Sequence, residues 1–346
     1  MPEAVPAPAP AAQPALAAEL TELLQGYQRT QLLYVAAELG LADFFTPGPQ
    51  SVEALAAATD THPPSLYRLL RALASLGVFA ERGDGRFELT PLAALLQPET
   101  PGSLRAMVLA GGADFYPVWG ELLSSVRTGR TAFEQVYGVS NWEYRRRHPE
   151  VNARFNALMA DYARQTAAGV VANYRFPESG VVIDVGGGTG TLLAAVVRQH
   201  AGLEGVLFDQ PHVVAEATAV MDAAGVADRC RIEAGDFFAA VPAGGDVYIL
   251  SWILHDWDDA RAADILIQCR RAMASRARLL VVERVIPPGN DPSPGKLIDI
   301  HMLLINAGGR ERTEEEWRAL LEASGFSLRS STPIGRGFSV LEALPF

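Results

Sequence analysis

Residues 181–200 read VVIDVGGGTGTLLAAVVRQH, which is an apolar run of strand length, a glycine-rich turn and an apolar helical segment. A strand, a glycine turn and a helix in this order let the backbone approach a nucleotide-like ligand. The dinucleotide fingerprint needs glycine at its first, third and sixth positions, but the sixth position counted from Gly186 is Thr191. The stretch therefore predicts an α/β domain with a glycine loop and leaves its ligand open.

Beyond Phe176, short apolar runs alternate with helical stretches up to the C-terminus. Strands that alternate with helices indicate a doubly wound parallel sheet, here of about seven strands. The final two runs are close enough in sequence to form a hairpin at one edge. The predicted strands are GVVIDV (180–185), EGVLFD (204–209), CRIEAGD (230–236), DVYILS (246–251), ARLLVVERV (277–285), FSLRSSTP (326–333) and GFSVLEALP (337–345).

The N-terminal part of the chain has helical spacing and contains a smaller unit at residues 51–90. This unit reads as a helix, a turn at residues 60–64, a second helix and a hairpin turning at residues 83–85, which is the outline of a winged helix-turn-helix. The second helix offers only Arg68 and Arg71 as cations, and the formal net charge of the chain is -11. We therefore expect a protein-interaction module and no nucleic-acid partner.

Several bulk features limit the cellular context. Residues 1–14, MPEAVPAPAPAAQP, lack the basic start and apolar segment of a secretory signal and are predicted to be a disordered tail. No apolar stretch approaches the length of a membrane span, of about 20 residues. Cys230 and Cys269 form no C-x-x-C pair and are interpreted as buried thiols in the cytoplasm. The trio 145–147, all arginine, is interpreted as a solvated helix face.

Acidic residues follow five successive predicted strands, at the carboxyl-end edge where ligands bind in such sheets. Because these ends meet at one edge, we expect the side chains to surround one ligand. They are Asp184, Asp209, Asp236, the run SWILHDWDD (251–259) and Glu283.

The first three of these residues suit S-adenosylmethionine. Asp184 stands two residues before the first glycine of the loop, where its charge is well placed for a ligand with a cationic end. Asp209 can accept both ribose hydroxyls. Asp236 is placed to take the adenine amino group and Phe237 to cover the ring.

His255 has two interpretations at this stage. It is a base at the end of its strand, or it caps the following helix DDARAADILIQCRRAMA (258–274), with Asp256, Asp258 and Asp259 supplying capping and first-turn charge. A metal site in HDWDD is disfavoured because no other His or Cys stands at ligand spacing. Glu311 lies just before a capping box formed by Thr313 and Glu316, so the box does not account for it.

Six stretches of the sequence together carry a resemblance to a known family: DVGGGTG, LFDQPHV, GDFF, LHDWDD, VVERVIP and GGRERTEEEW. Over nearly its whole length the chain resembles the small-molecule O-methyltransferases that depend on S-adenosylmethionine, of the plant caffeate type and their bacterial natural-product relatives. The resemblance implies a Rossmann-like seven-stranded methyltransferase domain at residues 179–346 and an N-terminal winged-helix dimerisation domain at 15–105. It further implies a helical linker that lines the substrate pocket at 106–178, and a homodimer.

Matched by motif position, His255 resembles the catalytic base, and Glu283 and Glu311 resemble two carboxylates that hold it. One of these carboxylates is expected to accept a hydrogen bond from a ring nitrogen and so narrow the gap between a histidine pKa of about 6.5 and a phenol pKa of about 10. One position departs, because plant enzymes carry lysine where this chain has Ser251. The other implied contacts are Gly186, Gly188 and Trp257 with the cofactor, and Phe155, Met159, Tyr162, Met302 and Asn306 with the acceptor.

The expected activity is transfer of the methyl group of S-adenosylmethionine to a hydroxyl of a small phenolic acceptor, in cytoplasmic natural-product biosynthesis. The expected by-product is S-adenosylhomocysteine, and neither a metal nor a membrane is expected to take part. One alternative is a family member with altered chemistry, namely N-methylation, hydroxylation or decarboxylation. Another is a cofactor-sensing winged-helix regulator, which would need a basic recognition helix and no catalytic histidine.

Overall fold

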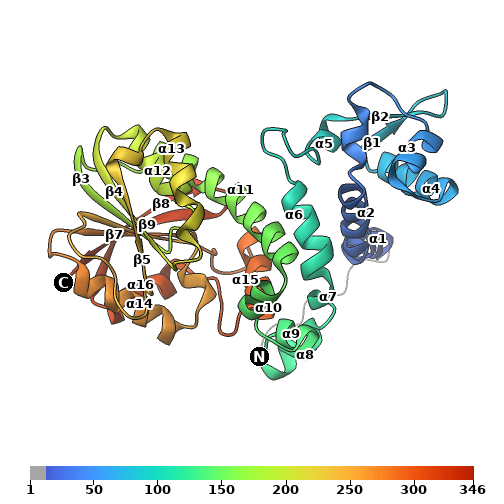
Figure 1. Cartoon of the computed structure of the whole chain (residues 1–346). Coiled ribbons are helices and arrows are strands. Elements are labelled where there is room, and N and C mark those ends of the chain that lie inside the picture. The colour runs from blue at the N-terminus through green and yellow to red at the C-terminus, as the bar shows by residue number, and fades with distance from the viewer. Residues whose placement is uncertain (1–12) are drawn as a thin grey trace, which may run out of the picture. The chain divides into compact units, whose positions relative to one another are not determined.

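The computed structural model describes residues 13–346, which form two compact units that meet in sequence between Tyr116 and Pro117 (Figure 1). The predicted tail lies outside the described residues except for Gln13 and Pro14, which begin α1 (Gln13–Leu24). Within residues 13–346, none of the helices has the length and apolar character that crossing a membrane requires.

The second unit is built on a seven-stranded sheet of order β5-β4-β3-β6-β7-β9-β8. The first five strands in this order run parallel, whereas β9 runs antiparallel to both β7 and β8. The predicted doubly wound sheet with a hairpin at its edge is therefore confirmed. The strands are β3 (Ser179–Val185), β4 (Gly202–Asp209), β5 (Cys230–Ala234), β6 (Val247–Ser251), β7 (Arg278–Arg284), β8 (Phe326–Gly335) and β9 (Phe338–Pro345).

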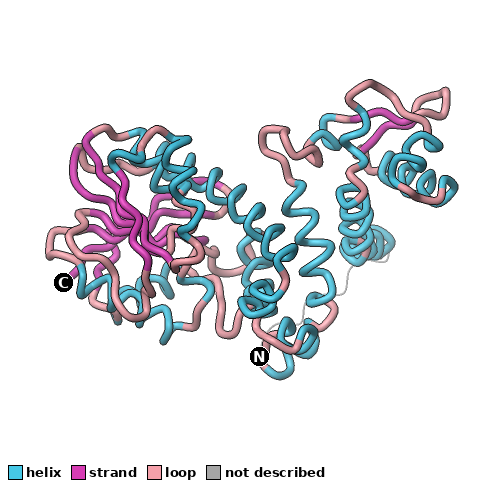
Figure 2. Tube along the Cα trace, viewed as in Figure 1, coloured by secondary structure: helices cyan, strands magenta, loops and turns pink. Residues whose placement is uncertain are grey.

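Helices cover both faces of this sheet, and neighbouring residues of one strand face different helices (Figures 1 and 2). Ile183 packs toward α14 and α16, whereas Val182 packs toward α11 and α12. A strand buried on both faces explains why its sequence is a continuous apolar run rather than an alternating one. The covering helices are α11 (Pro149–Asn173), α12 (Thr191–Gln199), η3 (Val214–Glu216), α13 (Ala217–Ala224), η4 (Ala227–Arg229), α14 (Asp259–Ala272) and α16 (Glu314–Ala323).

The remaining elements of the second unit precede the sheet or emerge from its carboxyl-end edge. Of the predicted linker, residues 106–116 fall in the first unit and residues 117–178 in the second, whose core α11 joins. These elements are α7 (Tyr116–Trp119), α8 (Leu122–Thr128), α9 (Ala132–Tyr137), α10 (Asn141–Arg147), η5 (Leu254–Asp256) and α15 (Pro294–Ile305).

The first unit contains the predicted helix-turn-helix and hairpin. The hairpin closes through the Arg82 N–H, which donates to the carbonyl of Arg86 over 2.8 Å. Phe79 and Phe87, one from each strand of the hairpin, are fully buried. The elements are α1, α2 (Gly26–Glu38), η1 (Leu41–Phe45), α3 (Val52–Thr59), α4 (Pro63–Ser75), β1 (Phe79–Glu81), β2 (Phe87–Leu89), α5 (Pro91–Ala94), α6 (Arg105–Leu109) and η2 (Ala110–Phe115).

The N-cap of α14 tests the interpretation of His255 as a helix cap. Asp258 is the N-cap of α14, since its side chain accepts from the Arg261 N–H over 2.8 Å, and the capping box of Thr313 and Glu316 forms at α16. The interpretation of His255 as a cap of α14 is therefore wrong, and Asp256 does not serve the helix either.

The two cysteines have different environments. Cys269 is buried in α14, and burial raises its pKa to about 12. Cys230 is only half-buried because it begins β5, the edge strand of the sheet. The interpretation of both as buried thiols is correct for Cys269 and wrong for Cys230.

Candidate active site

The loop after β3 turns sharply because its glycines adopt positive φ, 72° at Gly186 and 61° at Gly188. A Cβ at Gly186 would lie 2.5 Å from Ile253 Cδ1 and 3.5 Å from Phe237, whereas no atom of the described residues would lie within 4 Å of one at Gly188. The loop therefore packs closely on the chain after β6 on one side and leaves open space on the other. Such open backbone is where a ligand can approach a glycine loop.

Asp184, near the end of β3, is 1% exposed. Among the described residues, neither of its carboxyl oxygens accepts a hydrogen bond of normal distance and angle. Burial and the charge of Asp209 raise its pKa to about 7, partly offset by the Leu193 N–H. A buried carboxyl group in this state lacks a cation or donor. It fits the cationic end of a ligand.

Asp209, at the end of β4, is tied to the loop, since it accepts from the Gly188 N–H over 2.8 Å and from the Gln210 N–H over 2.6 Å. Each oxygen accepts one bond and keeps a lone pair for a ligand hydroxyl. Burial raises the pKa of Asp209, opposed by these two amides and by His212.

An aromatic group lies next to the loop. The Phe237 and Trp257 rings meet edge to face at 6.4 Å between centroids, and Phe238 packs against both. Asp236 is exposed and accepts from the Phe238 N–H over 2.9 Å, which orders the turn that presents Phe237. Ser251 is half-buried at the end of β6 and pairs through its backbone with β7.

The histidine loop after β6 is held by one buried carboxylate. Glu283 Oε1, at the end of β7, accepts from the N–H groups of Ile253 and Leu254 over 2.9 Å and of His255 over 3.4 Å. From another side, the fully buried Arg312 donates to the carbonyls of Leu254 and Trp257 and pairs with Asp259. Glu283 thus binds N–H groups of the histidine loop, and Arg312 binds carbonyl groups of the same loop.

His255 itself is 6% exposed, and its Nδ1 lies 3.0 Å from Glu311 Oε1 but 3.9 Å from Glu283 Oε2. Because a carboxylate only accepts, Nδ1 carries the hydrogen, and Nε2 has a free lone pair when the ring is neutral. Burial alone lowers the pKa of His255, but the charges of Glu283, Asp256 and Glu311 outweigh it and raise the pKa to about 10. Glu311 therefore orients the ring and Glu283 orients the loop.

Asp256, interpreted from the sequence as serving the helix after SWILHDWDD, instead lies beside the histidine ring. Its Oδ1 lies 3.7 Å from His255 Nε2 and accepts from Asn306 Nδ2 over 2.6 Å. Asn306 Oδ1 accepts in turn from Asn141 Nδ2 over 3.1 Å. A chain of polar groups from α10 thus reaches Nε2 of the histidine. Both the nitrogen and the oxygen of the Asn306 side-chain amide take part in hydrogen bonds of this chain.

The trio of arginines divides. Arg146 and Arg147 are exposed and pair with Glu143, as predicted, whereas Arg145 is 5% exposed. The guanidinium of Arg145 lies 3.1 Å from the centroid of Phe155, and its charge partly offsets the burial that raises the pKa of Asp256. The interpretation of Arg145 as solvated is wrong, because α10 turns this side of the helix inward.

The predicted acceptor residues come from two helices. Phe155, Met159 and Tyr162 share one face of α11, and the Tyr162 ring stacks on Trp252 at 4.8 Å. Met302 and Asn306 share a face of α15 and are buried. His301 of the same helix stacks on Trp119, and burial together with Arg145 and His255 lowers its pKa to about 4. These contacts give mostly aromatic surroundings.

The histidine group also has metal-like spacing. One ligand atom from each of His255, Glu283 and Glu311 lies within 4.8 Å of the others. However, Glu283 Oε1 already accepts three amides and Glu311 Oε1 binds Nδ1. Two of these oxygens are therefore already used in holding the histidine and its loop, and burial raises the pKa of Glu283 to about 7.

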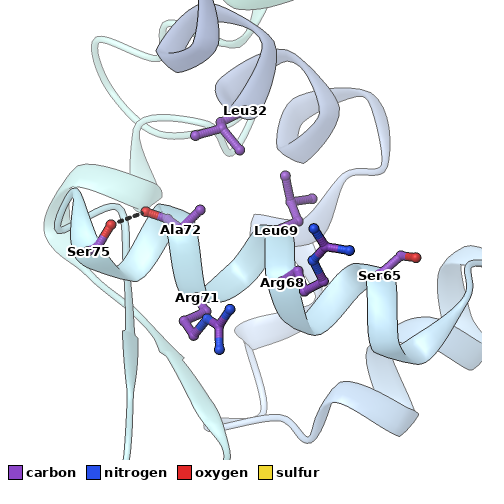
Figure 3. A pocket seen from close by; sticks show the side chains of 7 residues that line it. All are labelled: Leu32, Ser65, Arg68, Leu69, Arg71, Ala72 and Ser75. Atoms are coloured by element: carbon purple, nitrogen blue, oxygen red, sulfur yellow. Dashed lines mark hydrogen bonds between the residues drawn. The ribbon is translucent and has the colours of Figure 1, made fainter. Parts of the chain in front are cut away.

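The first unit has a separate hollow of about 550 Å³ over α4, opposite Leu32 of α2 (Figure 3). No predicted site residue lines it. Its leucines and small side chains are mixed with two arginines, one of which, Arg71, lies 5.5 Å from the Tyr67 ring. The lining residues are Leu32, Ser65, Arg68, Leu69, Arg71, Ala72 and Ser75.

Comparison with known families gives two matches that together span most of the chain. The family model described as an O-methyltransferase domain matches residues 119–327. The model described as an O-methyltransferase dimerisation domain matches residues 21–99.

Individual relatives match almost end to end. Phenazine O-methyltransferase PhzM of Lysobacter antibioticus is 47% identical over 330 residues, 95% of this chain and 96% of that protein. The crystal structure of the O-methyltransferase NcsB1 from neocarzinostatin biosynthesis, in complex with S-adenosylmethionine and 2-hydroxy-5-methyl naphthoic acid, has a TM-score of 0.81 at 32% identity and covers 92% of this chain and 96% of that chain. Phenazine-1-carboxylate N-methyltransferase of Pseudomonas aeruginosa is 33% identical and covers 91% of this chain and 93% of that protein.

The state of Asp184 predicts a pH-dependent stability change. Its folded pKa of about 7 exceeds the ordinary value of 3.8, so ionisation costs stability as pH rises between the two, and the cost is complete above the higher value. Asp184→Asn removes that cost. Without a bound ligand, the variant should melt at a higher temperature than the wild type at pH 8. The difference between the two melting temperatures should shrink toward pH 5. A thermal melt at both values measures it; equal gains at both would contradict the assignment.

Proposed function

Because this chain belongs to the O-methyltransferase family, we propose that it transfers the methyl group of S-adenosylmethionine to a hydroxyl of a small phenolic acceptor in natural-product biosynthesis. The observation that carries the proposal is the buried His255, whose Nδ1 is bound to Glu311 and whose Nε2 is left for an acceptor. The same proposal assigns the chain to the cytoplasm, which its free cysteines support.

The residues around the glycine loop fit the cofactor. Asp184 offers a buried carboxyl group without a cationic partner among residues 13–346. Asp209 offers lone pairs for ribose hydroxyls, and Phe237 and Trp257 offer flat surfaces for adenine. Gly186 and Gly188 let the backbone approach, with Asp236 and Ser251 at neighbouring strand ends. When bound, S-adenosylmethionine supplies a methyl group on a positively charged sulfur.

His255 is proposed to take the hydroxyl proton at Nε2. The phenol pKa of about 10 and the His255 pKa of about 10 are matched, so the proton can pass at little cost once the ring is in its neutral form. Glu311 stabilises the imidazolium through Nδ1, and Glu283 keeps the loop in place. No step requires a metal.

The acceptor is proposed to lie against Phe155, Met159, Tyr162, Met302 and Asn306. The aromatic and thioether side chains suit a flat, mostly neutral ring. The naphthoic acid in the complex of NcsB1 supports this class of acceptor. N-methylation remains the alternative chemistry, since an N-methyltransferase is similar over most of the chain.

The main test uses methyl-labelled S-adenosylmethionine with phenols, naphthoates, phenazines and matched aromatic amines, with products identified by mass spectrometry. We expect label on oxygen of at least one phenolic acceptor, undiminished by EDTA. His255→Gln should lower kcat by about 10²- to 10⁴-fold while cofactor affinity remains near wild type. Label found only on amines would favour the N-methylation alternative, and an unchanged rate in the variant would remove His255 as the base.

The two glutamates should respond differently to removal of charge. Glu311→Gln removes the charge that faces Nδ1 and should lower kcat about ten- to hundredfold. Because kcat/KM rises with pH as His255 loses its proton, this variant should also move the rising limb to lower pH. Glu283→Gln keeps an oxygen that can accept from the three amides, so its loss of kcat should be smaller than that of Glu311→Gln. Glu283→Ala removes this acceptor and should disorder the histidine loop. Equal losses in both Gln variants would contradict these roles.

The chain is further proposed to form a homodimer through the unit matched by the dimerisation model. Supporting this, α1 buries none of its residues and exposes Leu20 to 69% and Leu23 to 73%. An apolar stripe of this kind marks an interaction surface.

The double variant Leu20→Asp/Leu23→Asp should convert the dimer to a monomer of 37.1 kDa, measured by light scattering after size exclusion. Two charges on the apolar stripe would have to be buried without partners. Leu297→Asp, an equally exposed leucine of α15, is the matched control and should stay dimeric. A double variant that remains dimeric would rule out α1 as the interface.

A further inference from the structure

Trp252, the first residue after β6, has an unusual backbone. Its φ is 60°, a region in which residues with large side chains are strained. The other described non-glycine residues with positive φ are Asp60, which ends α3, and Arg336, which lies in the turn between β8 and β9. Trp252 differs from both because it continues directly from a central strand of the sheet.

The strained turn has a direct structural result. Ile253, the next residue, returns to right-handed helical angles. The N–H groups at the start of a helical turn have no partner within the turn and can converge on one anion. Here the three N–H groups of residues 253–255 converge on Glu283 Oε1 and form an amide nest that fixes the histidine loop. The positive φ of Trp252 is the turn by which the chain leaves β6 and enters this nest.

The Trp252 side chain is held by partners from separate elements. Nε1 donates to Thr166 Oγ1 of α11 over 3.1 Å, and Tyr162 of α11 stacks on the ring at 4.8 Å. Phe338 of β9 packs on the ring at 4.4 Å, and the His255 ring meets it edge to face at 5.6 Å. These contacts stabilise a backbone conformation that tryptophan would not adopt by itself.

Thr166 and Tyr162 lie on the same face of α11 as the proposed acceptor residues Phe155 and Met159, at spacings of three and four residues. We propose that Trp252 is a positioning residue that ties the acceptor-lining face of α11 to the amide nest and thereby sets the position of the His255 ring. This role rests on the proposed function, because Trp252 acts through His255.

The kinetic test compares Trp252→Phe, which keeps a ring but loses the N–H, with Thr166→Val, which loses the acceptor. Each should lower kcat by about tenfold, since small displacements of a catalytic group are costly. The KM for S-adenosylmethionine should stay within about twofold. Because both variants remove the same hydrogen bond, the double variant should be no slower than either single one.

Tyr248→Phe is the matched control, since Tyr248 lies four residues earlier on β6 and its buried hydroxyl donates to the Pro242 carbonyl over 2.9 Å. It should lower the melting temperature and leave kcat unchanged. If Trp252→Phe does not fold, Thr166→Val with the same control still tests the proposal.

Amide hydrogen exchange gives a readout that needs neither ligand nor turnover. In the free protein, residues 253–255 should exchange faster in Trp252→Phe and Thr166→Val than in the wild type, and Tyr248→Phe should not affect them. Absence of methyl transfer by the wild type would overturn the proposed function but would leave this measurement intact. An active wild type with unchanged kcat and exchange in both variants, or additive losses in the double variant, would overturn the inference.

Discussion

The carboxylate of Glu283, fully buried at the end of β7, is the contact on which the rest of the site depends. It collects the N–H groups of residues 253–255 on one oxygen, while Arg312 collects carbonyls of the same loop. With its backbone groups bound on both sides, the loop can hold the His255 ring against Glu311 and start α14 at Asp258. A buried charge is tolerated where several hydrogen bonds compensate it.

Concentrating acidic groups in this way has an electrostatic consequence. Burial raises the pKa values of Asp184, Glu283 and Asp256, and the neighbouring carboxyl groups add to the effect. The free protein therefore retains protons that a positively charged ligand can displace. Groups held ready for charge that arrives with the reactants need little rearrangement during the reaction.

The sequence predicted what depends on local pattern. Seven apolar runs gave seven strands, turn residues gave the hairpin and the helix-turn-helix, and the capping box left Glu311 as the residue without a structural explanation. It could not predict Arg145 or Asp256, because their burial depends on how α10 and α15 pack against the histidine loop. The positive φ of Trp252 could not be predicted from the sequence either, because tertiary contacts rather than residue type stabilise it.

The serine at position 251 fits this electrostatic picture. The resemblance to the plant enzymes implies lysine at this position, and a lysine at the end of β6 would bring a cation to the edge of the sheet that holds Asp184 and Asp209. In this chain burial raises the pKa of both carboxyl groups, opposed at Asp209 by the N–H groups of Gln210 and Gly188 and by His212. The charge that Asp184 lacks must then come from the ligand. A cationic cofactor consequently gains an attraction to this pocket that a neutral analogue does not share.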